Sequence, residues 1–179
     1  MVTQPRIFIA KDGRRAVLRS IKWEDLDDAV EFINSLADEG VDIYRAQRVT
    51  RNEEADWLGR RLARIEKGEI IDVVAEVDGK VVANSEVEKR TGVMSHLGYL
   101  GLAIKSGYRG IGIGTAIMQA LVEESRMAGL KVLFLDHYET NKVARELYEK
   151  VGFKEAGRIP KAIHRDGTYT DLVRMVLEL

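Results

Sequence analysis

The residues best suited to chemistry lie in one glycine-dense stretch. Residues 109–114 read Arg-Gly-Ile-Gly-Ile-Gly, after an apolar run at 99–104 and a polar turn. A helical pattern begins at Thr115. Glycines let a backbone approach a phosphate closely, and the first N–H groups of a helix have no partner inside it. With the guanidinium of Arg109 beside them, these groups form a candidate anion site, or else a tight turn that only needs small residues.

Two other phosphate sites can be compared with this loop. A P-loop needs a Lys-Ser/Thr pair after its last glycine, whereas Gly114 is followed by Thr115-Ala116. A dinucleotide site fits better, because Asp136 follows Gly112 by 24 residues, close to where a ribose-binding acid belongs. The glycine spacing is not G-x-G-x-x-G, however, and too little chain remains to complete a doubly wound sheet.

A few titratable side chains elsewhere could take part in proton transfer. Glu86 and Glu88 alternate with Val87, so both share one face of a predicted strand, where they point to a cleft or to solvent. His96 and His137 could titrate near neutral pH or serve only in packing. The chain has no cysteine and its three histidines are isolated, so we expect neither a thiolate nucleophile nor a metal site.

The elements that must position these residues follow a clear order. An Asp-Gly turn predicts a hairpin over 6–19, and Thr50 and Glu53 have the spacing of a capping box. Helices are predicted at 23–37, 51–67, 115–128 and 141–150. Strands are predicted at 70–77, 81–89, 95–104, 131–136, 153–163 and 169–177, with 41–49 irregular. The order β-β-α-α-β-β-β-α-β-α-β-β indicates an α+β fold, a mostly antiparallel sheet with one central βαβ crossover.

Composition limits the partners. The chain has 179 residues, 45% hydrophobic and 32% charged, with a net charge of −1, so no overall field favours nucleic acid. No long apolar span or signal peptide is visible, so we expect a cytoplasmic protein that does not bind membranes.

Two motifs together resemble one protein family. Residues 109–114 resemble the R/Q-x-x-G-x-G/A loop of the GNAT family of acyl-CoA N-acyltransferases. Residues 141–153 resemble that family's N-x-x-A-x-x-L-Y-E-x-x-G-F helix, at the family's spacing from the loop. The close match covers about 99–153, and the order of elements agrees over nearly the whole chain. Ser106 stands where the family often has proline, which we interpret as a minor departure.

The resemblance implies a splayed sheet with helices on both faces and acetyl-CoA in the wedge. Within this family pattern, three groups of residues would hold the co-substrate: backbone groups of Leu102, Ala103 and Ile104 along the pantetheine arm; Arg109, Gly110, Gly112, Gly114 and Thr115 at the pyrophosphate; and Asn141 near the pantetheine. Tyr148 would lie beside the sulfur, where a protonated phenol can donate to the departing thiolate, unless it only packs under the sheet.

The implied reaction needs a neutral amine and therefore a base. Asp136, five residues before Asn141, lies where protein N-terminal acetyltransferases of the family tend to carry an acid, although a salt bridge is an equal alternative. Glu86, acting through water, is the second candidate. Residues 20–56 hold eleven acids and four bases, and the rest of the chain sums to about +6. An acidic half suits a cationic acceptor amine and a basic half suits a nucleotide, unless these are only solvated helix faces.

The sequence thus predicts a single GNAT-like domain over 1–179, in which 6–67 shape the acceptor side, 70–153 form the cofactor core and 153–177 form a C-terminal hairpin. The expected activity is metal-free transfer of an acetyl group from acetyl-CoA to a primary amine, on a small molecule or a protein. Peptide N-termini, lysines, polyamines and small amines all remain open, as does the choice between monomer and homodimer. The alternative is a module of the same fold that binds acyl-CoA without turnover.

Overall fold

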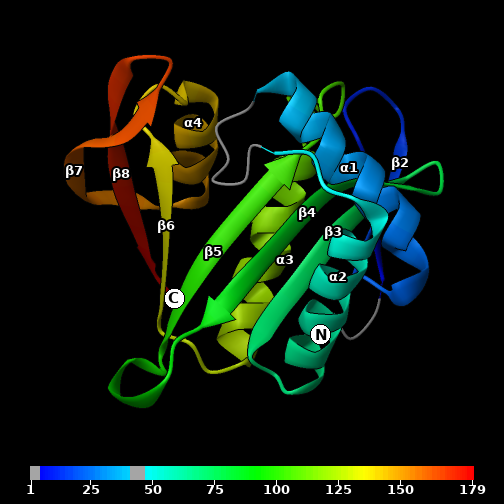
Figure 1. Cartoon of the computed structure of the whole chain (residues 1–179). Helices are drawn as coiled ribbons and strands as arrows, with labels where there is room; N and C mark the ends of the chain where they lie inside the picture. Colours follow the sequence, from blue (N-terminus) through cyan, green and yellow to red (C-terminus); the bar gives the residue numbers. More distant parts are fainter. Residues whose placement is uncertain (1–4, 41–46) are drawn as a thin grey trace.

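The computed structural model describes residues 5–40 and 47–179, so residues 41–46 of the segment expected to be irregular lie outside it. All strands join one sheet in the order β1-β2-β3-β4-β5-β6-β8-β7 (Figure 1). The strands are β1 (Arg6–Ile9), β2 (Arg15–Arg19), β3 (Ile70–Val77), β4 (Lys80–Lys89), β5 (Leu97–Ile104), β6 (Val132–Tyr138), β7 (Lys154–Arg165) and β8 (Thr168–Glu178). The helices are η1 (Trp23–Asp25), α1 (Leu26–Glu39), α2 (Arg51–Glu66), η2 (Gly92–Met94), α3 (Ile113–Met127) and α4 (Lys142–Val151). The predicted α+β architecture is confirmed.

The sheet is antiparallel except where β5 meets β6. These two strands are parallel, and they pair only from Leu97 opposite Val132 to Tyr99 opposite Phe134. Beyond that point the strands diverge, as Figure 1 shows. On its β6 side the backbone of the second half of β5 therefore faces a wedge, while on its other side it pairs with β4 as far as Ile104.

Helices cover both faces of the sheet, as expected (Figure 1). On one face α3 packs its Ile117 and Leu121 into a cluster that includes Val87 and Leu100. On the other face α1 and α2 contribute Leu26 and other apolar side chains to a separate cluster against β3 and β4. Burying each such side chain contributes roughly 1.5–3 kcal/mol, so the two helical layers hold the central strands between them.

Local sequence signals fix several of the element ends. The capping box at the start of α2 is confirmed, because the Thr50 hydroxyl accepts a hydrogen bond from the Glu53 N–H while Glu53 bonds back to Thr50 N–H. Gly40 ends α1 in the left-handed conformation with φ +61°, which glycine adopts without strain. The strand predicted at 131–136 runs on to Tyr138, because pairing with β8 continues to Leu172.

Candidate active site

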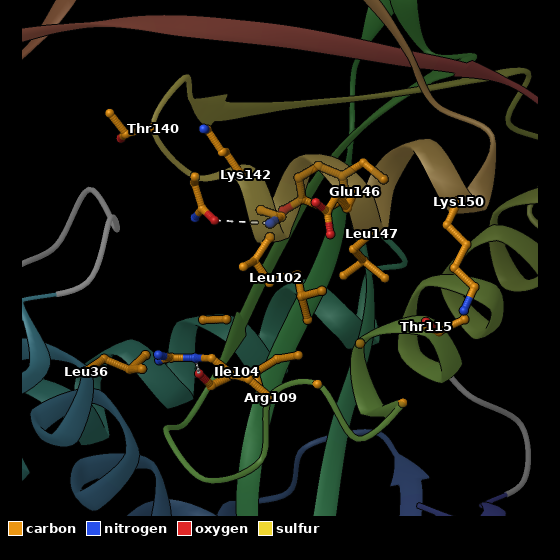
Figure 2. A pocket seen from close by; sticks show the side chains of 18 of the residues that line it. Leu36, Leu102, Ile104, Arg109, Thr115, Thr140, Lys142, Glu146, Leu147 and Lys150 are labelled. Carbon is orange, nitrogen blue, oxygen red and sulfur yellow. Dashed lines mark hydrogen bonds between the residues drawn. The ribbon is translucent and has the colours of Figure 1, made fainter. Parts of the chain in front are cut away.

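A cavity of about 910 Å³ opens in the wedge, between β5, the glycine loop and α4 (Figure 2). It lies where β5 and β6 have separated. Ten of the residues singled out from the sequence line it: Leu102, Ala103, Ile104, Arg109, Gly110, Gly112, Gly114, Thr115, Asn141 and Tyr148. The chain therefore brings together every residue expected at the cofactor, although they come from four separate elements and loops.

The glycine loop has the backbone conformation of an anion cradle. Gly110 and Gly112 have φ values of +76° and +99°, which other residues adopt only with strain. A Cβ at Gly110 would meet no described atom within 4 Å, so the space beside it is open. Gly112 is the N-cap of α3, and no side chain of the described residues caps that helix. The first N–H groups of α3 are thus available to a negatively charged ligand.

Gly114 has a different reason to be glycine. A Cβ there would lie 2.9 Å from Leu147 Cδ2 and 3.1 Å from Ile104 Cδ1. Because these atoms belong to α4 and β5, the missing side chain lets α3 pack closely against both. The third glycine of the loop therefore shapes the cavity wall through packing.

Arg109 is held by two protein partners. Its Nε donates to the Ile104 carbonyl at 2.7 Å, and Figure 2 shows the two residues side by side. Its second terminal nitrogen donates to Glu39 Oε2 at 2.5 Å, while the Ser106 N–H donates to Glu39 Oε1 at 3.0 Å. The carboxylate of Glu39, at the end of α1, thus accepts hydrogen bonds from Ser106 and Arg109, next to the loop that is expected to bind phosphate. The sequence did not indicate this role of Glu39.

α4 presents two of the expected residues to the cavity. Asn141 is its N-cap, and its Oδ1 accepts the Ala144 N–H at 3.1 Å, so its Nδ2 is the group left to donate to a ligand. Tyr148 is only 7% exposed, and burial raises the pKa of its phenol to about 12. The hydroxyl is therefore protonated at neutral pH. Val143, in the first turn of α4, is 70% exposed, although the helical pattern of the sequence predicts that it points inward.

The two base candidates are both held by arginines. Both oxygens of Asp136 accept from Arg174 at 2.8 Å, and the side chain is only 6% exposed. Glu86 Oε2 accepts from Arg61 at 2.8 Å, whereas no described residue donates to its Oε1, and the side chain is 34% exposed. Neither lines the cavity. Asp136 thus has its ion pair complete, and Glu86 has one oxygen available.

Arg61 connects Glu86 to the core. This buried guanidinium donates to Asp72 Oδ1 at 2.7 Å and to the Ser85 carbonyl at 2.8 Å. Asp72, fully buried, also accepts the Ile21 N–H at 2.7 Å. Since a buried charge must be paired, Asp72 fixes Arg61, which in turn fixes Glu86 on the α2 side of the sheet.

The histidines occupy different environments. His137 is buried, with its Nδ1 2.9 Å from the Tyr138 carbonyl and no partner for Nε2 among the described residues. Its ring centroid lies 6.0 Å from that of Tyr148. His96 is exposed. Across the described ranges, no three His, Cys, Asp or Glu side chains are grouped to hold a metal ion.

The acids of α1 do not form a bare negative surface. All five pair with basic side chains: Asp27 with Arg51, Asp28 with Lys80, Glu31 with Lys105, Asp38 with Arg48, and Glu39 with Arg109. Lys80 comes from β4, Lys105 directly follows β5, and Arg109 begins the glycine loop. The uneven charge along the sequence is therefore matched across the fold, which favours paired helix faces over an acidic docking surface.

A known protein family matches most of the chain. The family model "Acetyltransferase (GNAT) family" matches residues 31–153, which is 123 of the 179 residues. The chain belongs to the GNAT family of acetyltransferases. As a member, it is an acetyl-CoA-dependent N-acetyltransferase that acts on amine-bearing substrates. Within the described residues, none of its helices is both long and apolar enough to cross a membrane.

Individual relatives of this GNAT acetyltransferase match to different extents. The L-methionine sulfoximine/L-methionine sulfone acetyltransferase of Pseudomonas paraeruginosa is 25% identical over 92% of this chain and 95% of its own length. The match to "Probable N-acetyltransferase camello" of Xenopus tropicalis, 30% identical, spans 54% of this chain and only 45% of that protein. The YncA structure from Salmonella typhimurium, solved with its cofactor acetyl-CoA, has the same fold, with a TM-score of 0.79, 20% identity, and coverage of 91% and 93% of the two chains.

Proposed function

We propose that this enzyme acetylates a small primary amine by direct attack on acetyl-CoA, with Tyr148 as the acid and Glu86 as the base. One observation carries the proposal. A single cavity joins an uncapped helix N-terminus, an unpaired strand edge and a buried protonated phenol. These are the groups that a pyrophosphate, a pantetheine amide and a departing thiolate need.

The cofactor side follows from the position of each group along the cavity. The N–H groups at the start of α3, with Gly110 and Gly112, receive the pyrophosphate, and Thr115 lies in the first turn of the helix. Backbone groups of 102–104 bond the pantetheine as a strand would. Asn141 donates from Nδ2, because its Oδ1 already caps α4. Arg109 holds the loop in place through the Ile104 carbonyl.

Acetyl-CoA supplies the thioester carbonyl that the amine attacks. A protonated amine first gives one proton to the base, which passes it to solvent. The neutral amine then forms the C–N bond as the C–S bond breaks, and the second proton lost by the nitrogen balances the one that the leaving sulfur gains. An amine of pKa ~10.4 is about one part in 2,500 neutral at pH 7, so proton removal by a base is needed. Tyr148 donates to the sulfur from the α4 wall of the cavity.

We assign the base to Glu86 in preference to Asp136. Glu86 has a free Oε1 among the described residues and is partly exposed, so it can accept a proton directly or through water. Both oxygens of Asp136 accept hydrogen bonds from Arg174, and accepting a proton would break that ion pair. The choice of base therefore depends on which carboxylate has an oxygen without a hydrogen-bond donor.

A small acceptor is favoured over a protein. One of the relatives that match nearly the full chain is an L-methionine sulfoximine/L-methionine sulfone acetyltransferase, and another is named an N-alpha-acetyltransferase, so the test includes a peptide N-terminus. The acids of α1 are all paired, so they offer no extended acidic surface to a basic peptide. Acetylation of a peptide N-terminus, a protein lysine or a polyamine is an alternative result that the test below can detect.

The test is release of CoA thiol from acetyl-CoA in the presence of single amines: L-methionine sulfone, spermidine, Nα-acetyl-lysine and a short peptide with a free N-terminal alanine. We expect turnover with the first. Fastest turnover with the peptide, the lysine derivative or spermidine would replace the small-acceptor assignment. Acetyl-CoA binding by calorimetry with no thiol release on any amine would favour the alternative, a non-catalytic acyl-CoA-binding module.

A further inference from the structure

The cation that the glycine loop offers to a pyrophosphate is already paired within the protein. Arg109 donates to Glu39 Oε2 at 2.5 Å and to the Ile104 carbonyl at 2.7 Å, so a carboxylate offsets its charge. The start of α3 adds only the partial positive charge of a helix N-terminus, about half of an elementary charge. Each phosphate of a pyrophosphate diester carries a negative charge at neutral pH. The loop and the helix together therefore leave much of that charge uncompensated.

The turn between β1 and β2 brings a second cation to the loop. Lys11 lines the same cavity as Gly110 and Gly112, although it comes from the N-terminal hairpin and lies outside the residues that the family model matches. A Cβ at Gly112 would lie 4.0 Å from Lys11 Cγ, so the lysine stem passes beside the N-cap of α3. The rest of this flexible stem is long enough to bring the ammonium group to the first N–H groups of the helix.

Hydrogen bonds fix the hairpin to the loop. The Lys11 N–H donates to the Ile111 carbonyl at 2.9 Å, between the two glycines of the loop that have positive φ. Arg14 donates to the Gly107 carbonyl at 2.8 Å, and its guanidinium carbon lies 4.4 Å from the centre of the Tyr108 ring. The hairpin therefore presents Lys11 at a fixed place beside the loop.

The ammonium group of Lys11 has no partner among the residues that the structure describes. The neighbouring carboxylate, Asp12, already accepts from Arg14 Nε at 2.6 Å. Lys150 also lines the cavity and points toward Thr115 in the view of Figure 2, but it lies in the last turn of α4, where a cation stabilises the helix end. Lys150 thus has a second role in the fold, whereas no described contact accounts for the charge of Lys11.

We propose that Lys11 binds the pyrophosphate of acetyl-CoA and supplies the cation that Arg109, paired with Glu39, does not. The inference rests on the function proposed above, because it takes the start of α3 as the pyrophosphate site. The ammonium group donates to a phosphate oxygen from the hairpin side, while the N–H groups of α3 donate from the helix side. The β1–β2 hairpin is then a wall of the cofactor site, and salt weakens the binding of acetyl-CoA.

The test measures the Kd for acetyl-CoA by calorimetry in Lys11→Met, Lys11→Arg and the matched control Arg15→Met. Arg15 is an exposed cation of the same hairpin and is not among the residues that line the cavity. We expect Lys11→Met to raise the Kd about fivefold to thirtyfold, between the effects of an exposed and a desolvated ion pair. The Kd should stay within about threefold of the wild type in Lys11→Arg and Arg15→Met. Raising the ionic strength should weaken binding less in Lys11→Met than in the wild type.

The same measurements with 3′-dephospho-acetyl-CoA identify which phosphate Lys11 binds. This compound keeps the pyrophosphate and lacks the phosphate on the ribose, so Lys11→Met should raise its Kd by the same factor. A loss that disappears with 3′-dephospho-acetyl-CoA would assign Lys11 to the ribose phosphate and overturn the proposal. A Kd in Lys11→Met within twofold of the wild type, or an equal loss in Arg15→Met, would overturn it too.

These binding measurements separate the inference from the proposed function. They need no turnover, so an enzyme that acetylates none of the tested amines can still show the loss in Lys11→Met and support the role of Lys11. A wild type that binds no acetyl-CoA would refute the cofactor site itself, and the role of Lys11 with it.

Discussion

Replacing Tyr148 by phenylalanine removes one hydroxyl from a buried ring and leaves its packing in place. The ring is 7% exposed and lies 6.2 Å from the ring of Phe153, measured between centroids. Because burial raises the pKa of the phenol to about 12, Tyr148 stays protonated from pH 7 to beyond pH 10. It can therefore donate a hydrogen bond over the whole range in which acceptor amines lose their protons.

The same pKa limits how much Tyr148 can contribute. The leaving thiolate resembles a cysteine thiolate with a pKa of ~8.5, about 3.5 units lower, so complete proton transfer would be uphill by roughly 5 kcal/mol. Tyr148 therefore acts chiefly by donating a hydrogen bond while the C–S bond breaks. A hydrogen bond to a charged group is worth about 1.5–3 kcal/mol, which corresponds to about 10- to 10²-fold in kcat.

Steady-state kinetics of the wild type and Tyr148→Phe, with acetyl-CoA binding by calorimetry, measure this effect. We expect kcat to fall about 10- to 10²-fold at every pH from 7 to 10, with the Kd within twofold, because the lost interaction belongs to the transition state. The loss should shrink with an acyl donor whose thiol is more acidic. A phenylalanine variant with full kcat would return Tyr148 to the core, and a loss that vanishes between pH 9 and 10 would contradict the raised pKa.

Three further predictions, which use four variants, test the remaining roles. Gly112→Val, at φ +99°, should lower acetyl-CoA affinity at least tenfold, about 1.4 kcal/mol, in calorimetry on protein whose circular dichroism shows a folded state; unchanged affinity would remove the loop from the cofactor site. Glu86→Gln should lower kcat at neutral pH by about 10²-fold, which is more than Asp136→Asn should. The loss should shrink at higher pH as the amine becomes neutral, and a larger loss in Asp136→Asn would make Asp136 the base. Arg61→Met leaves the fully buried Asp72 without its cation and should lower the free energy of unfolding by about 3–5 kcal/mol in urea titrations; a loss below about 1 kcal/mol would contradict the buried pair.

The residues that line the cavity were expected from the resemblance to the GNAT family, and the two motifs that carry this resemblance are local in the sequence. Gly110 and Gly112 have positive φ values, which the residue type glycine favours. Asn141 and Gly152 are residue types that are common at the two ends of a helix, and they cap α4. The loop, one strand and α4 follow one another along 99–153, so a single crossover brings them together. Short separation along the chain is what made the prediction possible.

The partners of the charged groups could not be read in the same way. Asp136 meets Arg174, 38 residues away, only because β8 pairs with β6 in this register. Glu39 meets Arg109 across 70 residues, and no local pattern links the end of α1 to the glycine loop. Gly114 belonged to the phosphate motif, yet its contact with Leu147 depends on how α3 and α4 pack. Such pairings depend on which elements become neighbours, and residue types alone do not specify that.

The early parting of β5 and β6 has a consequence for folding. It gives the protein two sheet edges in its interior, with backbone donors and acceptors that no third strand satisfies. At a surface such edges invite pairing with other chains, but here α4 and the glycine loop wall them in. If the pantetheine arm bonds to this edge as proposed, it binds only the folded chain, and at 100 times its Kd it should add about 2.7 kcal/mol to the free energy of unfolding. The acetyl donor would then take the place of a strand as well as react, and the free energy of unfolding would rise with the concentration of acetyl-CoA.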